Sequence, residues 1–156
     1  MINEAGLKIL KDSEGFYNKS YICPAGKWTI GYGTTVYPNG VKVSKNEYCT
    51  IDQAEKWLNY ELEHKSVTIM NWLAKNKLTL NTNQFSALLC FAYNLGCGAI
   101  IDNDRSLSQA LLSGKNIRYA FMMYVKAKKK KFGITYSVTL NGLVKRRKLE
   151  ADLFFS

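Results

Sequence analysis

The sequence predicts an α+β fold in which a small N-terminal α+β lobe is joined by a long helix to a helical C-terminal lobe. Residues 16–35 are rich in aromatic and β-branched residues and glycine, as strands and tight turns are. Residues 51–75 place apolar side chains at helical spacing without Pro or Gly. The chain has 156 residues, of which 47% are hydrophobic and 2 are prolines, and this suits one domain with lobes at about 1–50 and 76–156.

The N-terminal lobe begins with a short helix. Residues 3–12 alternate apolar and charged positions behind Asn3, a good N-cap, and the helix should end near Glu14. The aromatic segment that follows has a Pro-Ala-Gly turn at residues 24–26. It therefore predicts a small hairpin or a three-stranded sheet.

Two capping-box patterns follow. Ser44 with Glu47 predicts a short helix, and Thr50 with Gln53 predicts the start of the long connecting helix over 51–75. This helix should link the two lobes, and lobe boundaries are common positions for ligand sites.

The second half of the chain predicts further helices and no linker. Apolar runs are preceded by capping residues and closed by glycine, which are the usual start and stop signals. The expected helices cover 81–93, 106–113, 116–127 and 142–154.

The termini and cysteines limit the class of protein. Charges at Glu4 and Lys8 interrupt the first twelve residues, so no signal peptide is expected, and no apolar run reaches the ~18 residues of a membrane span. The four cysteines lack CxxC spacing and His64 is the single histidine, so neither a metal site nor another cofactor is predicted. Reduced thiols are expected, although a disulfide formed after export stays open.

Glu14, Cys23 and Thr29 are the candidate catalytic residues. Taken singly, each has an ordinary explanation: Glu14 as a solvated charge, Cys23 as a turn residue and Thr29 as a strand residue. A carboxyl group at a helix C-terminus feels the negative end of the helix dipole, which favours its neutral, proton-donating form. A sheet curling back over that helix would bring Cys23 and Thr29 into the same cleft.

The spacing of these residues resembles a known family. Eight residues separate Glu14 from Cys23 and five separate Cys23 from Thr29, within EGFYNKSYICPAGKWTIGYGTT. This is similar to the signature of phage-type lysozymes, the endolysins of glycoside hydrolase family 24, whose middle position is Asp or Cys. NQFSALLCFAYNLGCG and GLVKRRKLEADLF resemble two further motifs of that family, in the same order.

The resemblance implies a two-lobed fold and hydrolysis of the β-1,4 bond between N-acetylmuramic acid and N-acetylglucosamine in peptidoglycan. Glu14 would be the general acid, and Cys23 and Thr29 would hold or activate the attacking water, as in an inverting hydrolase. Lys27 is a candidate cation for lowering the pKa of Cys23. A covalent intermediate on the Cys23 thiolate is a lower-ranked alternative.

The resemblance also implies substrate contacts and a biological setting. Tyr93, Asn94 and Ser106 would meet the sugar, although packing or helix capping explains them as well. The helix spacing of Arg146 and Glu150 leaves two alternatives open: the arginines form a structural pair on the helix surface, or Arg146 or Arg147 reaches toward Glu14 and positions it. A monomeric endolysin would wait in the host cytoplasm until a holin opens the membrane, and would then act on the wall.

Basic residues are concentrated in the second lobe. The net charge is +10, and 11 of the 22 Lys and Arg residues lie between Lys115 and Lys148, with no acidic residue between Asp104 and Glu150. This indicates either a solvated face or attraction to the anionic cell envelope. Residues 126–140 replace the Gly-rich turn usual in the family, and are expected to form a loop that touches the membrane or is specific to the host.

Three other functions compete with hydrolysis. Lys128–Lys131 beside Phe132 and Tyr136 would suit a nucleic-acid-binding protein, but that hypothesis leaves the spacing of the candidate catalytic residues unexplained. An inactive homologue that only binds the wall would keep the fold. A lytic transglycosylase would share the substrate and a catalytic Glu, and would differ in its products.

Overall fold

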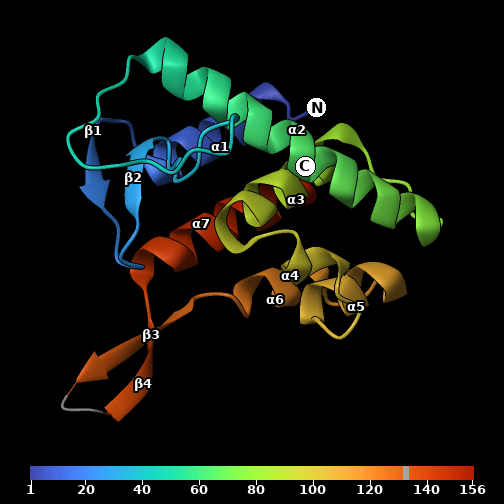
Figure 1. The fold of residues 1–156 in the computed structure, drawn as a ribbon. Coiled ribbons are helices and arrows are strands. Elements are labelled where there is room, and N and C mark those ends of the chain that lie inside the picture. Colours follow the sequence, from blue (N-terminus) through green and yellow to red (C-terminus); the bar gives the residue numbers. More distant parts are fainter. Residues whose placement is uncertain (132–133) are drawn as a thin grey trace.

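The chain folds into two lobes around a central helix (Figure 1). The computed structural model describes residues 1–131 and 134–156, and the side chains of all of these except 129–131 and 134. The elements, in order, are α1 (Glu4–Glu14), β1 (Tyr17–Ile22), β2 (Trp28–Gly31), α2 (Ile51–Lys75), α3 (Thr82–Leu95), α4 (Gly98–Ile101), α5 (Ser106–Ser113), α6 (Ile117–Met122), β3 (Lys126–Lys131), β4 (Ile134–Thr139) and α7 (Asn141–Phe154). The α+β prediction is confirmed.

The first lobe contains α1 and an antiparallel hairpin. The Asn3 side chain accepts a hydrogen bond from the backbone N–H of Gly6, which is the predicted cap of α1. β1 and β2 pair with Ile22 opposite Trp28, and the sheet has two strands within the described residues. The two-stranded alternative of the prediction is therefore the correct one.

The short helix predicted at Ser44 does not form. The Ser44 hydroxyl and backbone N–H do donate to the Glu47 carboxylate, at 2.9 and 3.0 Å, but they close a turn. Asn46 has a φ of 63°, which is left-handed and incompatible with a continuing helix. The backbone of Glu47 instead bonds to Ser20 of β1, so the predicted capping box fastens a loop to the sheet.

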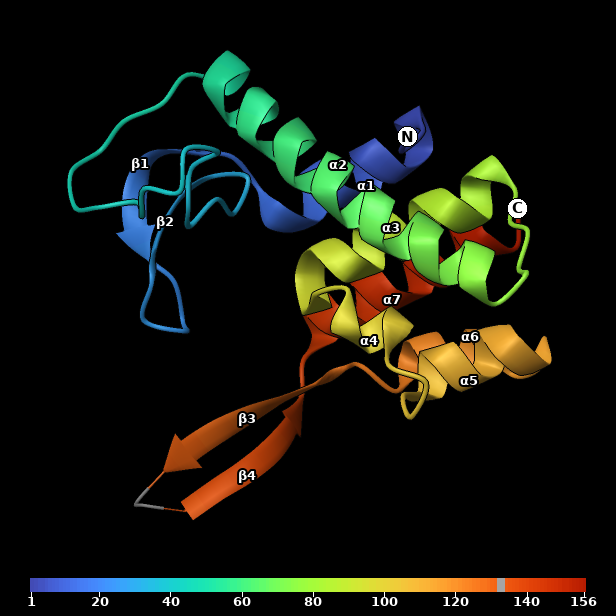
Figure 2. The same cartoon turned by 45° about the vertical axis from the view of Figure 1, so that its right-hand side comes forward.

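α2 is the long connecting helix, and it begins where predicted. Both hydrogen bonds of the capping box between Thr50 and Gln53 are present. One stripe of the helix is buried, including Leu58, Leu62 and Ile69, and the opposite face is exposed. In both views α2 runs along the upper side of the molecule from the first lobe to the second (Figures 1 and 2).

α3 is the centre of the hydrophobic core. Every residue from Ser86 to Ala92 is fully buried, because α3 packs against α1, α2 and α7. α7 therefore brings the C-terminal part of the chain against α1, and this contact builds the site described below.

The sequence predicted a purely helical second lobe, but the structure has two strands there as well. α6 ends at Met122, short of the predicted 127, and the strands β3 and β4 pair antiparallel where a loop was expected over 126–140. The β4 sequence ITYSVT is rich in strand-forming residues, and it pairs in register with β3, placing Lys126 opposite Thr139. Phe132, on which the nucleic-acid alternative partly depends, lies outside the described residues.

Two further observations bear on the sequence expectations. In the part of the chain that the structure describes, none of the helices combines the length and apolarity needed to cross a membrane. The four cysteines are free thiols.

Candidate active site

Glu14 is the last residue of α1, and its side chain is directed to α7. Gly15 ends the helix with a φ of 70°, a backbone conformation that favours glycine. The Glu14 Oε1 atom accepts a hydrogen bond of 2.5 Å from Arg146 Nη1. The Arg146 side chain is 6% exposed and that of Glu14 is 21% exposed, so the carboxylate is reachable from solvent while its partner is buried.

A buried network holds Arg146 in place. Its Nε donates to Glu150 Oε1 at 3.0 Å, and its Nη2 donates to the carbonyl oxygen of Cys90 at 3.1 Å. The guanidinium is buried and is held by these hydrogen bonds to α3 and α7. It can therefore position Glu14 with little freedom. The sequence spacing had suggested a weak pair on the helix surface, which is wrong, since Glu150 is fully buried.

Arg147 contacts Asn94, which is one of the candidate substrate-binding residues. Its Nη2 donates to Asn94 Oδ1 at 2.9 Å and to Glu150 Oε1 at 3.1 Å. Burial raises the pKa of Glu150 to about 7 against the opposing effect of the two arginines, and burial lowers the pKa of Arg147 to about 10. Because Arg147 is bonded to Asn94, the arginine that reaches Glu14 is Arg146.

Gly33 and Tyr93 close the other side of the carboxylate. Gly33 has a φ of 102°, and a β-carbon built on it would lie 3.4 Å from Glu14 Oε2 and 3.8 Å from the Tyr93 hydroxyl oxygen. That hydroxyl donates to the carbonyl oxygen of Tyr32 at 2.7 Å. Burial raises the pKa of Tyr93, and the charges of Glu61 and Glu14 act in the same direction. Tyr93 thus joins α3 to the first lobe beside Glu14.

Cys23 and Thr29 lie together on the β1–β2 hairpin. The backbone N–H of Cys23 donates to the carbonyl oxygen of Lys27 at 2.9 Å, and Thr29 Oγ1 donates to the same carbonyl at 3.1 Å. The pKa of Cys23 is lowered, chiefly by hydrogen bonding to the Thr29 side chain and then by the Lys27 backbone. The charge of Lys27, the candidate cation of the sequence analysis, has the smallest effect on the pKa of Cys23.

Tyr21 of β1 has a raised pKa to which both Cys23 and Glu14 contribute. Its pKa is raised by burial first, and then by the charges of Tyr17, Cys23 and Glu14. That the hairpin brings Cys23 and Thr29 into one cleft with Glu14 stays a prediction.

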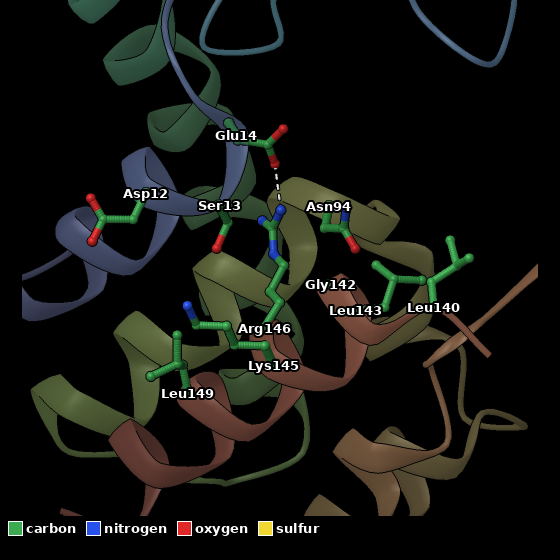
Figure 3. Close-up of a pocket in the computed structure, with 10 residues that line it drawn as sticks. All are labelled: Asp12, Ser13, Glu14, Asn94, Leu140, Gly142, Leu143, Lys145, Arg146 and Leu149. Carbon is green, nitrogen blue, oxygen red and sulfur yellow. Dashed lines mark hydrogen bonds and ion pairs between the residues drawn. The ribbon is translucent and has the colours of Figure 1, made fainter.

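A cavity of about 580 Å³ lies against Glu14 on the side of α7 (Figure 3). In Figure 3 the Arg146 side chain points up to Glu14, with Asn94 beside it. The lining residues are Asp12, Ser13, Glu14, Asn94, Leu140, Gly142, Leu143, Lys145, Arg146 and Leu149. Ser106 lies elsewhere, in a separate hollow with Gln109 and Tyr119, and α5 is capped by Arg105 without a side-chain hydrogen bond.

Sequence reasoning missed a second hollow, of about 350 Å³, between α2 and residues 35–40. Trp57, Tyr60, Glu61 and His64 line it from α2. Their spacing of three, four and seven residues places them on one helix face, and this periodicity was the available signal.

The fold and site define a class of protein. A solvent-accessible glutamate at the end of α1, fixed by a buried arginine of α7 and adjoining Gly33 of the first lobe, is suited to acid–base chemistry. The phage lysozyme family model matches residues 11–150. The chain belongs to that family, whose members are glycoside hydrolases.

Individual relatives agree with this assignment. The chain is 31% identical over 157 residues to an endolysin of Acyrthosiphon pisum secondary endosymbiont phage 1, covering 99% of this chain and 98% of that protein. It is 34% identical to an endolysin of Bacillus phage B103, of which it spans about half, 54%. Among solved structures it resembles the endolysin from Escherichia coli O157:H7 phage FAHEc1, with a TM-score of 0.84 and 29% identity, covering 99% of this chain and 92% of the other.

Proposed function

We propose that this protein hydrolyses the β-1,4 bond between N-acetylmuramic acid and N-acetylglucosamine in bacterial peptidoglycan, and so lyses the host cell. The observation that carries the proposal is the position of Glu14, held at 2.5 Å by Arg146 with Oε2 facing the first lobe. The order and spacing of Glu14, Cys23 and Thr29 add support.

Glu14 acts as the general acid. It donates its proton to the glycosidic oxygen as the bond from that oxygen to the anomeric carbon breaks. Since Oε1 is occupied by Arg146, Oε2 is the oxygen that donates. The carboxylate that remains is stabilised by the Arg146 cation.

Cys23 and Thr29 act on the attacking water. Thr29 orients the water, and the Cys23 thiolate accepts its proton while the oxygen attacks the anomeric carbon from the opposite face. The lowered pKa of Cys23 supports this role, because it increases the fraction of thiolate near neutral pH. Attack from the opposite face inverts the anomeric configuration. Tyr93 and Asn94, which lie beside Glu14, contact the sugar, and Ser106 stays a predicted contact farther along the second lobe.

The test is clearing of a peptidoglycan suspension by wild type and by Glu14→Gln, which keeps the size of the side chain. We expect wild type to clear it and Glu14→Gln to lose all measurable clearing with an unchanged unfolding midpoint. Cys23→Ser should weaken clearing. Full activity of Glu14→Gln would refute the mechanism, and folded wild type without activity would favour an inactive wall-binding homologue.

Product analysis separates related reactions. Hydrolysis leaves reducing ends, whereas a lytic transglycosylase leaves 1,6-anhydro ends. Tight DNA binding without wall hydrolysis would instead select the nucleic-acid alternative.

The biological setting follows from the proposed activity. The protein is made in the host cytoplasm, acts as a monomer and reaches the wall after a holin has opened the membrane, without direct contact with that holin. Lysis in cells should therefore require co-expression of a holin.

A further inference from the structure

The β3–β4 hairpin stands away from the rest of the molecule. In both views it projects beyond the helices of the second lobe (Figures 1 and 2). Its strands form a two-stranded sheet of their own. An isolated two-stranded hairpin buries little and is marginally stable in water, so its presence calls for an explanation beyond packing.

The hairpin is strongly cationic. Five of the six residues of β3 are lysines. The register places Lys126 opposite Thr139 and Lys128 opposite Ser137, so these two lysines share one polar face of the ribbon, and both are exposed. Neither takes part in any of the ion pairs found among the described residues. Their charges are therefore available to an external anion.

The base of the hairpin adjoins the candidate active site. The backbone N–H of Leu140, directly after β4, donates to the carbonyl oxygen of Val125 at 2.9 Å and closes the base. Leu140 and Lys145 line the same cavity as Glu14 (Figure 3). A strand of six residues extends about 20 Å, so the lysines begin at the cavity rim and continue outward from it.

We propose that this hairpin binds the carboxylates of the peptide stems carried by the peptidoglycan strand whose glycan lies at Glu14. The inference rests on the proposed function, because it takes the strand at Glu14 to be peptidoglycan. Amino sugars in the glycan are acetylated and uncharged, whereas each stem ends in a carboxylate and commonly carries further ones. Lysines, which are compact point charges on flexible stems, suit such dispersed anions.

The test compares two variants of equal charge. Lys126→Gln with Lys128→Gln removes the polar-face charges of the hairpin. Lys56→Gln with Lys75→Gln removes two exposed charges of α2, on the other side of the molecule. Each pair lowers the net charge from +10 by two, so the effect of overall charge is matched.

Two readouts keep the hairpin separate from catalysis. Binding to insoluble peptidoglycan is measured in the Glu14→Gln background, where no hydrolysis interferes. Hydrolysis is then measured on intact peptidoglycan and on glycan strands whose stems an amidase has removed. If wild type hydrolyses neither substrate, the proposed function fails, while the binding assay still tests the hairpin.

We expect the hairpin variant to bind intact peptidoglycan roughly three- to tenfold more weakly, as two exposed charge contacts predict, and its binding to depend less steeply on salt than that of wild type. The KM of the hairpin variant on intact peptidoglycan should rise with kcat unchanged. Its activity on strands without peptide stems should equal that of wild type. The α2 variant should match wild type in every assay. Unchanged binding, or an equal loss on stripped strands, would overturn the proposal. The proposal would also be overturned if the hairpin variant lost binding only to vesicles that contain phosphatidylglycerol. That result would assign the hairpin to the bilayer.

Discussion

Arg146 Nη1 lies 2.5 Å from Glu14 Oε1, so the buried guanidinium of α7 holds the carboxylate that ends α1. The two residues are 132 positions apart in the sequence. Their contact depends on α3, which packs against both helices. The packing of the core therefore sets the position of the proposed proton donor.

The first prediction concerns Arg146→Lys. An ammonium keeps the charge but cannot contact Glu14, Glu150 and the Cys90 carbonyl with one planar group. We expect kcat/KM on peptidoglycan to fall about 10- to 100-fold through misplacement of Glu14. The pH–rate profile should also shift, which a purely structural role would not produce. Arg118→Lys, in an exposed pair with Asp152, is the matched control and should retain full activity.

The second prediction concerns the stability of the buried network. Burial raises the pKa of Glu150 to about 7 in the folded protein, above the ordinary value of 4.5. Between these pH values the folded state holds a proton that the unfolded state has lost, so the free energy of unfolding falls as pH rises through this window. Below pH 4.5 the contribution is fully present, and above about 7 it is lost.

Glu150→Gln cannot titrate and should lack this slope. The free energy of unfolding of wild type, relative to that of Glu150→Gln, should decrease by on the order of 1–3 kcal/mol between pH 4.5 and 7. Denaturant unfolding at several pH values measures it. Asp152→Asn, which changes an exposed pair on the same helix, should run parallel to wild type. A constant difference between wild type and Glu150→Gln would contradict the assigned direction.

Local signals in the sequence predicted most of the fold. The caps at Asn3, Thr50 and Asn81 and the stop at Gly114 are formed by residues within a few positions of one another, and the structure has them as expected. The capping pattern at Ser44 failed because the same hydrogen bonds also close a turn, and pairing of Glu47 with Ser20 decided between the two. That pairing is a tertiary contact that a local pattern does not contain.

The site was predictable only in part for the same reason. Spacing selected Glu14, Cys23 and Thr29, but it left open which arginine meets Glu14, because Arg146 and Arg147 are neighbours on a helix. The helix turns by about 100° per residue, so the two side chains diverge, one to Glu14 and the other to Asn94. The pairing of β3 with β4 was missed because a lysine-rich strand carries little hydrophobic pattern.

The third prediction concerns Gly33→Ala. The new methyl group would lie 3.4 Å from Glu14 Oε2 without a severe clash, and would cover the oxygen that is proposed to donate the proton. We expect at least a tenfold loss of kcat/KM. Gly40→Ala is the control, because Gly40 also has a positive φ, of 83°, but its β-carbon would meet nothing within 4 Å. Both variants should lose about 1–2 kcal/mol of stability from backbone strain, and only Gly33→Ala should lose activity. Equal activities would show that Oε2 does not face the substrate.

The last prediction concerns the pH dependence of Cys23. A base must be deprotonated to accept the proton of water, so the rate of wild type should rise with pH as the Cys23 thiol ionises. The hydrogen bond from Thr29 places that rise below the ordinary thiol value of 9.0. Thr29→Val removes the hydroxyl and should move the rise to higher pH.

Cys23→Asp replaces the thiol with a carboxyl group that ionises near pH 4 in ordinary surroundings. The acid limb of the pH–rate profile should therefore move down by several pH values, and activity near pH 6 should exceed that of wild type, while Cys23→Ser should stay low throughout because a hydroxyl does not ionise there. Clearing rates between pH 4 and 9 measure all three proteins. An acid limb common to wild type and Cys23→Asp would mean that another group takes the proton from water, and would leave Cys23 with a role in positioning alone.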